Sequence, residues 1–169
     1  MASKSKTKGS SWERDVAKLL TDLYDETFLR IPTSGAFLGG VNNHRTSSLD
    51  QSQIGSRRGD IQCPYDWKHA NIEAKNYQDL SFHQLIQQEC KQMDIWIDQT
   101  LEVAKSDDIN IIFFKITRKG SYVAVQDFPY LDKDRSLQYK DWFIFELQLY
   151  FDQNKTPFKN ACIKGMMNY

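Results

Sequence analysis

The sequence contains few cysteines and no long apolar run. Its three cysteines, Cys63, Cys90 and Cys162, are widely separated among 169 residues, which argues against both a disulfide framework and a structural zinc site. The apolar run 111–114 is stopped at once by Lys115, whereas a bilayer-spanning helix needs about 20 apolar residues. These absences exclude a membrane protein and lead us to expect a protein of a reducing cytoplasm.

The sequence also lacks an excess of either charge. It has 22 Lys plus Arg and 22 Asp plus Glu, so its net charge is zero, which excludes a wholly basic protein that coats nucleic acid. With 40% hydrophobic and 13% aromatic residues, the composition is that of a globular protein, and the length suffices for one domain with tails. Any polyanionic partner must therefore be met by a local basic patch.

Residues 1–9 differ in composition from the rest. They contain no acid and no apolar segment of the kind that marks a secretory signal, so we expect a flexible basic arm. Its basic residues are Lys4, Lys6 and Lys8. Behind the arm, Ser10 to Glu13 has the Ser-x-x-Glu form of a capping box, and apolar residues recur at helical spacing. We predict a helix from Ser10 to about Tyr24, with Glu13 at the edge of its apolar stripe.

A long polar segment follows a short strand candidate at 28–31. Residues 35–59 are rich in Gly, Ser, Asn and Gln without periodicity and are predicted to form a long polar loop. The stretch 28–59 has a local charge of plus three, because four arginines face the single acid Asp50. These arginines are Arg30, Arg45, Arg57 and Arg58. This stretch is the second basic patch.

Two strands and a helix are predicted in the middle of the chain. Residues 60–63 and 70–75 have strand character, and the turn residues that begin at Pro64 predict a hairpin between them. Residues 82–104 contain apolar side chains at near-helical spacing and neither Pro nor Gly, which predicts one long helix.

The last part of the chain completes a mixed sheet. A second hairpin is predicted over 109–117 and 122–126, whereas the pattern at 143–151 suits a strand or a helix. We predict an α/β protein of mixed α+β character, with a central mixed sheet flanked by helices in the order α-β-β-β-α-β-β. Residues 128–169 are a C-terminal extension whose structure the pattern does not decide.

The tripeptide acid-x-Lys occurs three times, at 66–68, 73–75 and 89–91. Side chains two residues apart share a face in a strand, but they diverge by about 200° in a helix. The pair at 89–91 lies in the predicted helix and the pair at 66–68 lies in the predicted turn. Only Glu73 and Lys75 would project a carboxylate and an ammonium together from a sheet.

Asp60 begins the strand that we expect to pair with the strand of Glu73. Two adjacent carboxylates make an oxygen-rich site suited to Mg²⁺ or Mn²⁺, and Glu13 could supply a third. A divalent ion there would activate water, while Lys75 orients the nucleophile or neutralises developing charge. The alternative is that these residues have structural roles only. Asp60 would begin a strand, Glu73 and Lys75 would form a solvated pair, and Glu13 would be half of a capping box.

Four short motifs follow one another along the chain. They are Lys8-Gly9 with Glu13 behind it, Arg30 to Gly35, Gly59-Asp60-Ile61, and Ile72 to Lys75. Their order and spacing over about residues 8–126 resemble the PD-(D/E)xK nuclease superfamily, and most closely its archaeal-type and phage Holliday-junction resolvases. The segment 36–59 is longer than in the compact archaeal enzymes, and the segment after Asp127 matches no part of the pattern.

The resemblance implies a Mg²⁺-dependent endodeoxyribonuclease, with Mn²⁺ as a substitute, on a restriction-endonuclease-like fold. Residues 10–169 would form a single nuclease domain. The implied metal ligands are Glu13, Asp60 and Glu73, and the implied catalytic residues are these three and Lys75. The implied partners are branched DNA, such as a Holliday junction in recombination or repair, and a second copy in a homodimer. We expect DNA contacts from Lys4, Lys6, Lys8, Arg30, Ser34, Arg57 and Arg58. The implied location is the nucleoid or the cytoplasm of a phage-infected host.

Several alternatives remain open. Gln99 could reach the site, although a surface amide is the simpler interpretation. His44 follows two asparagines as in an HNH nuclease, but His69 and His83 do not complete that arrangement, and surface or hydrogen-bonding roles are simplest for all three. The other functional hypotheses are a restriction-like or repair endonuclease on linear or damaged duplex, and a non-catalytic DNA-binding module on the nuclease fold. The intact acidic residues favour an enzyme.

Overall fold

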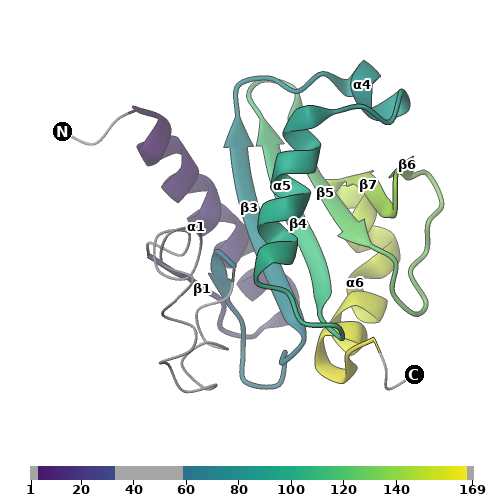
Figure 1. The fold of residues 1–169 in the computed structure, drawn as a ribbon. Helices are drawn as coiled ribbons and strands as arrows, with labels where there is room; N and C mark the ends of the chain where they lie inside the picture. The colour runs from purple at the N-terminus through teal and green to yellow at the C-terminus, as the bar shows by residue number, and fades with distance from the viewer. Residues whose placement is uncertain (1–3, 33–58, 167–169) are drawn as a thin grey trace.

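The computed structural model describes residues 4–32 and 59–166, with side chains from Gly9 onward (Figure 1). At its centre lies a five-stranded sheet with the order β3-β4-β5-β7-β6. The strands are β3 (Ala70–Tyr77), β4 (Ile109–Ile116), β5 (Gly120–Gln126), β6 (Leu137–Tyr139) and β7 (Trp142–Glu146). β3 runs parallel to β4, and the other neighbours are antiparallel. The predicted mixed sheet and the predicted second hairpin, β4 to β5, are therefore confirmed.

The first helix, α1 (Lys4–Tyr24), is longer than expected. It begins six residues before Ser10, so the predicted start at Ser10 is wrong and Ser10 lies inside the helix rather than at a cap. Lysine is a good helix former, and the helix tolerates Gly9 in its interior. A basic composition is therefore compatible with a helical turn as well as with a flexible arm.

Strands β1 (Leu29–Arg30) and β2 (Ile61–Gln62) pair antiparallel with each other. The predicted hairpin between 60–63 and 70–75 is therefore wrong, because its second strand belongs to the main sheet. β2 nevertheless lies beside the outer edge of β3, where the Asp60 N–H donates to the Ile72 carbonyl oxygen at 2.8 Å. The β1–β2 pair thus brings Asp60 to β3 by a route that local turn signals could not reveal.

Two helices, α4 (Phe82–Ile86) and α5 (Lys91–Glu102), connect β3 to β4. The predicted single helix over 82–104 is wrong, because the chain leaves the helical conformation between them and Gln88 has a φ of +62°. Leu85 before the break and Met93 after it are buried in the same hydrophobic cluster. Both helices thus bury apolar side chains on the same face of the sheet, and the apolar pattern continues across the break.

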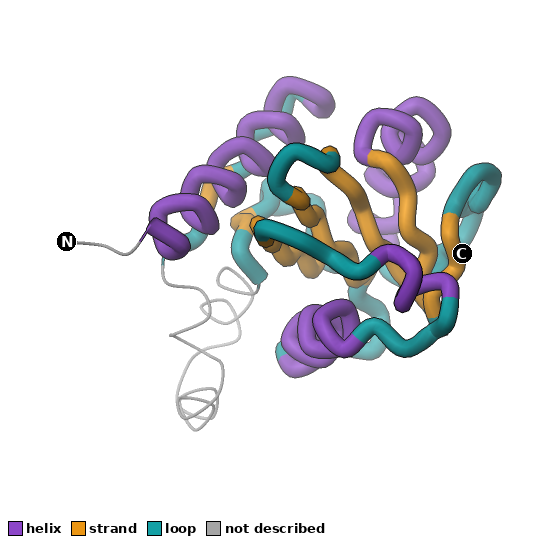
Figure 2. The backbone as a smooth tube through the Cα atoms, turned by 90° about the horizontal axis from the view of Figure 1, so that it is seen from above, coloured by secondary structure: helices purple, strands orange, loops and turns teal. Residues whose placement is uncertain are grey.

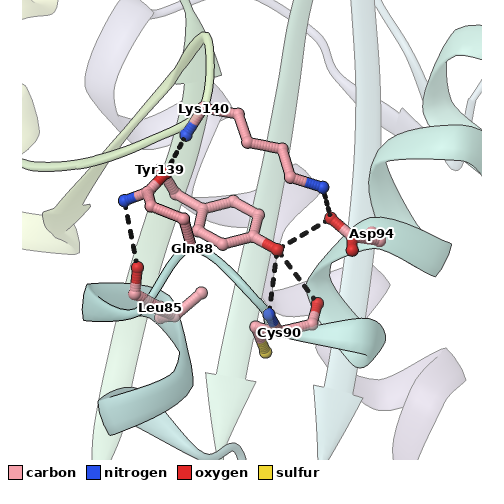
Figure 3. A network of polar contacts seen from close by, with 6 residues as sticks. All are labelled: Leu85, Gln88, Cys90, Asp94, Tyr139 and Lys140. Carbon is pink, nitrogen blue, oxygen red and sulfur yellow. Dashed lines mark hydrogen bonds and ion pairs between the residues drawn. The ribbon is translucent and has the colours of Figure 1, made fainter.

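A polar network fastens this break to the turn between β6 and β7 (Figure 3). The Tyr139 hydroxyl accepts a hydrogen bond from the Cys90 N–H at 3.0 Å and donates to Asp94 at 2.7 Å. Lys140 forms an ion pair with Asp94, and its N–H donates to the Gln88 side chain at 2.6 Å. Since Tyr139 is fully buried, these bonds hold α4 and α5 against the β6 edge of the sheet.

The segment 143–151 contains both structures that its pattern suits. β7 ends at Glu146, and α6 (Leu147–Lys164) begins at the next residue. The Glu146 carboxylate caps this helix by accepting a hydrogen bond from the Leu149 N–H at 3.0 Å. The C-terminal extension therefore supplies two strands and a flanking helix of the same layered structure.

Helices cover both faces of the sheet (Figure 2). α1 and α6 share one hydrophobic cluster with side chains such as Ile72 and Phe113, and α4 and α5 share the other with Phe114 and Tyr139. The Trp12 indole N–H donates to the Phe113 carbonyl oxygen at 3.0 Å and so ties α1 to the sheet. Within the described ranges, no helix is long and apolar enough to cross a bilayer.

Candidate active site

Strand β3 presents Glu73 and Lys75 on one face. Ile72 and Ala74 point to the other face and are buried against α1 and α6. Glu73 pairs in register with Ile112, whose side chain belongs to the cluster under α5. The Lys75 Nζ lies 2.8 Å from a Glu73 carboxylate oxygen. The predicted shared orientation of this carboxylate and this ammonium is therefore present.

Asp60 reaches the same place from the outer edge of β3. Its Oδ2 accepts a hydrogen bond from the Ala74 N–H at 2.9 Å. Gly59, directly before it, has a φ of +66°, and a Cβ there would lie 2.4 Å from the Ile72 carbonyl oxygen. Only glycine permits this approach. We call Asp60, Glu73 and Lys75 the carboxylate cluster.

The electrostatics of the carboxylate cluster follow from its burial. Asp60 is 8% exposed and Glu73 is 9% exposed. Burial and the adjacent charge of Asp60 raise the pKa of Glu73 to about 8, although Lys75 opposes this shift. Burial disfavours the charge of Lys75, but the attraction of both carboxylates outweighs it, so the pKa of Lys75 lies above its usual value. Asp60, Glu73 and Lys75 thus form one electrostatically coupled group in a desolvated place.

Glu13 and Arg30 form a separate pair beside this cluster. The Arg30 Nε donates to a Glu13 carboxylate oxygen, which joins α1 to β1. The side chains are 17% and 25% exposed, respectively. In the described part of the chain, Glu13, Asp60 and Glu73 do not form a trio whose ligand atoms all lie within 4.8 Å of one another. Glu13 is thus held by an arginine, whereas Asp60 and Glu73 are held by β3.

The carboxylate cluster fits a divalent cation. Its donors are hard oxygens, which Mg²⁺ and Mn²⁺ prefer. Burial and the neighbouring Asp60 carboxylate raise the pKa of Glu73 to about 8, so a bound cation would stabilise its ionised form. Asp60 and Glu73 would hold such an ion, and Glu13 lies on the adjoining helix as a candidate third ligand.

For most of the remaining predicted site residues, the side chain lies outside the described part of the chain. Ser34, Arg57 and Arg58 lie outside the described residues, as do the side chains of Lys4, Lys6 and Lys8. Gln99 is exposed on α5, as a surface amide would be. Sequence reasoning missed the role of Gly59, whose signal was a glycine directly before an acid, and it missed Arg30 as the partner of Glu13.

Comparison with protein families identifies the class. Residues 4–163 match the family described as "Phage putative PDDEXK endonuclease", and the chain belongs to this family. The mixed sheet flanked by helices is consistent with the restriction-endonuclease-like fold of these nucleases. No curated protein and no solved structure gave a significant match. The resemblance to the PD-(D/E)xK superfamily is thereby confirmed, together with its phage branch and its nuclease class.

Proposed function

We propose that this protein is a Mg²⁺-dependent, structure-selective DNA endonuclease that hydrolyses phosphodiester bonds at four-way junctions, as a Holliday-junction resolvase does. The observation that carries the proposal is the carboxylate cluster, in which Asp60, Glu73 and Lys75 meet at the β3 edge of the sheet. Membership of a PDDEXK endonuclease family supports the nuclease class.

Each residue of the cluster has a role in this proposal. Asp60 and Glu73 hold Mg²⁺, which Mn²⁺ can replace, and the bound ion supplies a Lewis acid and an activated water. Lys75 places its ammonium beside the reacting phosphate, where it orients the nucleophile and stabilises developing negative charge. The hydrogen bond from Ala74 and the contact with Glu73 hold Asp60 and Lys75 in place before DNA arrives.

The substrate proposal rests on charge distribution. A chain with zero net charge attracts DNA weakly overall, so recognition must come from local basic zones and from substrate shape. The basic zones are the lysines of the first nine residues and the arginines of 28–59. A homodimer would place two such sites on opposed strands of a junction. The proposed place of action is the cytoplasm of a phage-infected host.

The test compares three substrates of matched sequence: a four-way junction, a flap and a linear duplex. With Mg²⁺, we expect the junction to be cut at least about tenfold faster than the duplex, and we expect chelation to abolish cleavage. Asp60→Asn should abolish it as well, whereas Asp66→Asn, at an exposed acid of another acid-x-Lys tripeptide, should not. Equal rates on all three substrates would remove the junction claim.

The second candidate is an endonuclease on linear or damaged duplex, which the family description favours equally because it names no branched substrate. Faster cleavage of the duplex would establish it. Absence of cleavage and of Mg²⁺ binding by calorimetry, together with salt-sensitive DNA binding, would instead identify a non-catalytic DNA-binding module.

A further inference from the structure

A second group of potential metal ligands lies away from the carboxylate cluster. Ligand atoms of His69, Asp107 and Asp108 all lie within 4.8 Å of one another, and no other such trio occurs in the described ranges. His69 directly precedes β3, and the two aspartates directly precede β4. Since β3 and β4 are parallel, both loops meet at the same end of the sheet.

The surrounding backbone holds these three side chains in place. The His69 Nδ1 lies 2.9 Å from an Asp107 carboxylate oxygen. The Asp108 carboxylate accepts a hydrogen bond from the Lys105 N–H at 2.8 Å, and the residue is 5% exposed. Such outer hydrogen bonds orient the ligands of metal sites.

The C-terminal end of α6 forms one wall of this group. Gly165, with a φ of +76°, lies against the imidazole, and a Cβ there would be 2.9 Å from the His69 Nδ1. Glycine therefore makes the room that the ring occupies. The His69 N–H donates to the Cys162 carbonyl oxygen of α6, and the Met166 N–H donates to the Asp107 carbonyl oxygen. The negative end of the α6 dipole favours a cation here.

We propose that His69, Asp107 and Asp108 form a Zn²⁺ site that fastens the C-terminal end of α6 to the start of β3 and β4. An imidazole with two carboxylates suits Zn²⁺, whereas Mg²⁺ prefers oxygen ligands alone. The partial exposure of His69 and Asp107 admits the ion and leaves a position for water. The lack of paired cysteines in the sequence does not count against this site, because its ligands are nitrogen and oxygen.

The site is separate from the carboxylate cluster. Glu73 lies four positions after His69, which is roughly 13 Å along an extended strand. One ion therefore cannot bridge the two groups. The two sites should also differ in metal preference, with Zn²⁺ at His69 and Mg²⁺ at Glu73.

The experiment is a calorimetric Zn²⁺ titration of the full-length metal-free protein in an Asp60→Asn/Glu73→Gln background, which silences the carboxylate cluster. We expect one equivalent of Zn²⁺ to bind and Mg²⁺ to give no heat. Adding Asp107→Asn, which keeps the shape of the side chain, or His69→Ala should weaken Zn²⁺ binding more than tenfold. The matched control is His83→Ala, an exposed histidine on α4.

Thermal melting provides a second readout that does not depend on nuclease activity. At a hundredfold excess over the Kd, Zn²⁺ should raise the Tm of the background protein by about 5 °C or more, and this rise should vanish with Asp107→Asn. A melting transition without metal shows that each variant is folded. If the background does not fold, the wild-type protein saturated with Mg²⁺ replaces it.

Two results would overturn the proposal: no Zn²⁺ binding in the background, or Zn²⁺ binding that survives both Asp107→Asn and His69→Ala. In either case the contact between His69 and Asp107 is a hydrogen bond without a metal-binding role. Because the carboxylate cluster is silenced or saturated throughout, failure of the zinc site leaves the proposed nuclease untouched, and loss of nuclease activity leaves the zinc site testable.

Discussion

The carboxylate cluster and the Glu13–Arg30 pair lie close together in the fold, but their carboxylates are compensated by positive charge in different ways. Glu13 is compensated one to one by a guanidinium. Glu73 faces the Lys75 ammonium and the neighbouring Asp60 carboxylate together, and burial raises the pKa of Glu73 to about 8. The Glu13 carboxylate is already paired, whereas the ionised form of Glu73 is disfavoured by its surroundings and would be stabilised by a bound cation. This difference supports the proposal that the cluster, rather than the pair, is the metal-binding centre.

Loss of the ammonium should have the largest effect on the cluster. Lys75→Ala should lower kcat/KM for DNA cleavage by about 10³-fold, or about 4 kcal/mol of barrier, because the developing charge on the phosphate loses the stabilising Lys75 ammonium. Lys68→Ala, at an exposed lysine of another acid-x-Lys tripeptide, is the matched control and should retain activity. Normal cleavage by Lys75→Ala would show that the cluster is not the active site.

The stability of the metal-free protein should fall as the pH rises from about 4.5 to about 8. Folded Glu73 keeps its proton up to about pH 8, whereas the unfolded side chain loses it near 4.5, so the folded state binds more protons in this window. We expect the contribution of Glu73 to the free energy of unfolding to decrease by roughly 3–5 kcal/mol across this window.

Urea unfolding at several pH values, in the presence of a chelator, measures how steeply the free energy of unfolding falls with pH. Glu73→Gln should weaken this pH dependence because the amide does not titrate. Mg²⁺ should also weaken it, by binding the ionised form of Glu73. An equal slope in wild type and Glu73→Gln would mean that Glu73 titrates normally and that the contrast with Glu13 is false.

The Glu13–Arg30 pair should respond more weakly. Arg30→Ala should lower the free energy of unfolding by about 1–2 kcal/mol, because it leaves a largely buried carboxylate without its partner. Glu13→Gln/Arg30→Ala should recover part of this loss, and urea unfolding of both variants measures it. Glu13→Gln should reduce cleavage by only about tenfold; a loss as large as that of Asp60→Asn would place Glu13 in the same catalytic unit.

The smallest effect concerns the anchor of α1. Trp12→Phe preserves an aromatic ring in the core but removes the hydrogen bond from the indole N–H to the Phe113 carbonyl oxygen. We expect a loss of about 1 kcal/mol in the free energy of unfolding, measured by urea titration. Since α1 also carries Glu13, cleavage should fall no further than in Glu13→Gln. A greater loss of activity would mean that the position of α1 matters more than the Glu13 carboxylate itself.

Part of the fold could be predicted because its signals are local. The alternation around Glu73 and Lys75 placed their side chains on one strand face, and the β4–β5 hairpin followed from two apolar runs joined by a short polar turn. The break between α4 and α5 could not be predicted in this way. Both helices bury apolar side chains on the same face of the sheet, so the helical pattern continues across Gln88, where the backbone does not.

Asp60 shows more clearly what local sequence patterns cannot predict. Its approach to Glu73 was predicted from a hairpin that does not exist, since β2 pairs with β1. The approach instead comes from Gly59, whose lack of a Cβ lets the backbone pack against Ile72. The proximity of Asp60 to Glu73 was thus predicted for a wrong structural reason, and the catalytic role of these residues stays a prediction.

The sequence alone determined which residues are candidates for the chemistry: an acid-x-Lys pair on a strand, an acid after a glycine, and a glutamate on the first helix. Side-chain type and hydrophobic periodicity are local properties, so they can be read directly from the sequence. The tertiary structure decided which polar side chains meet, with Arg30 assigned to Glu13, Lys75 to Glu73, and His69 to Asp107. These assignments depend on distance and burial between elements far apart in sequence, which no local pattern records.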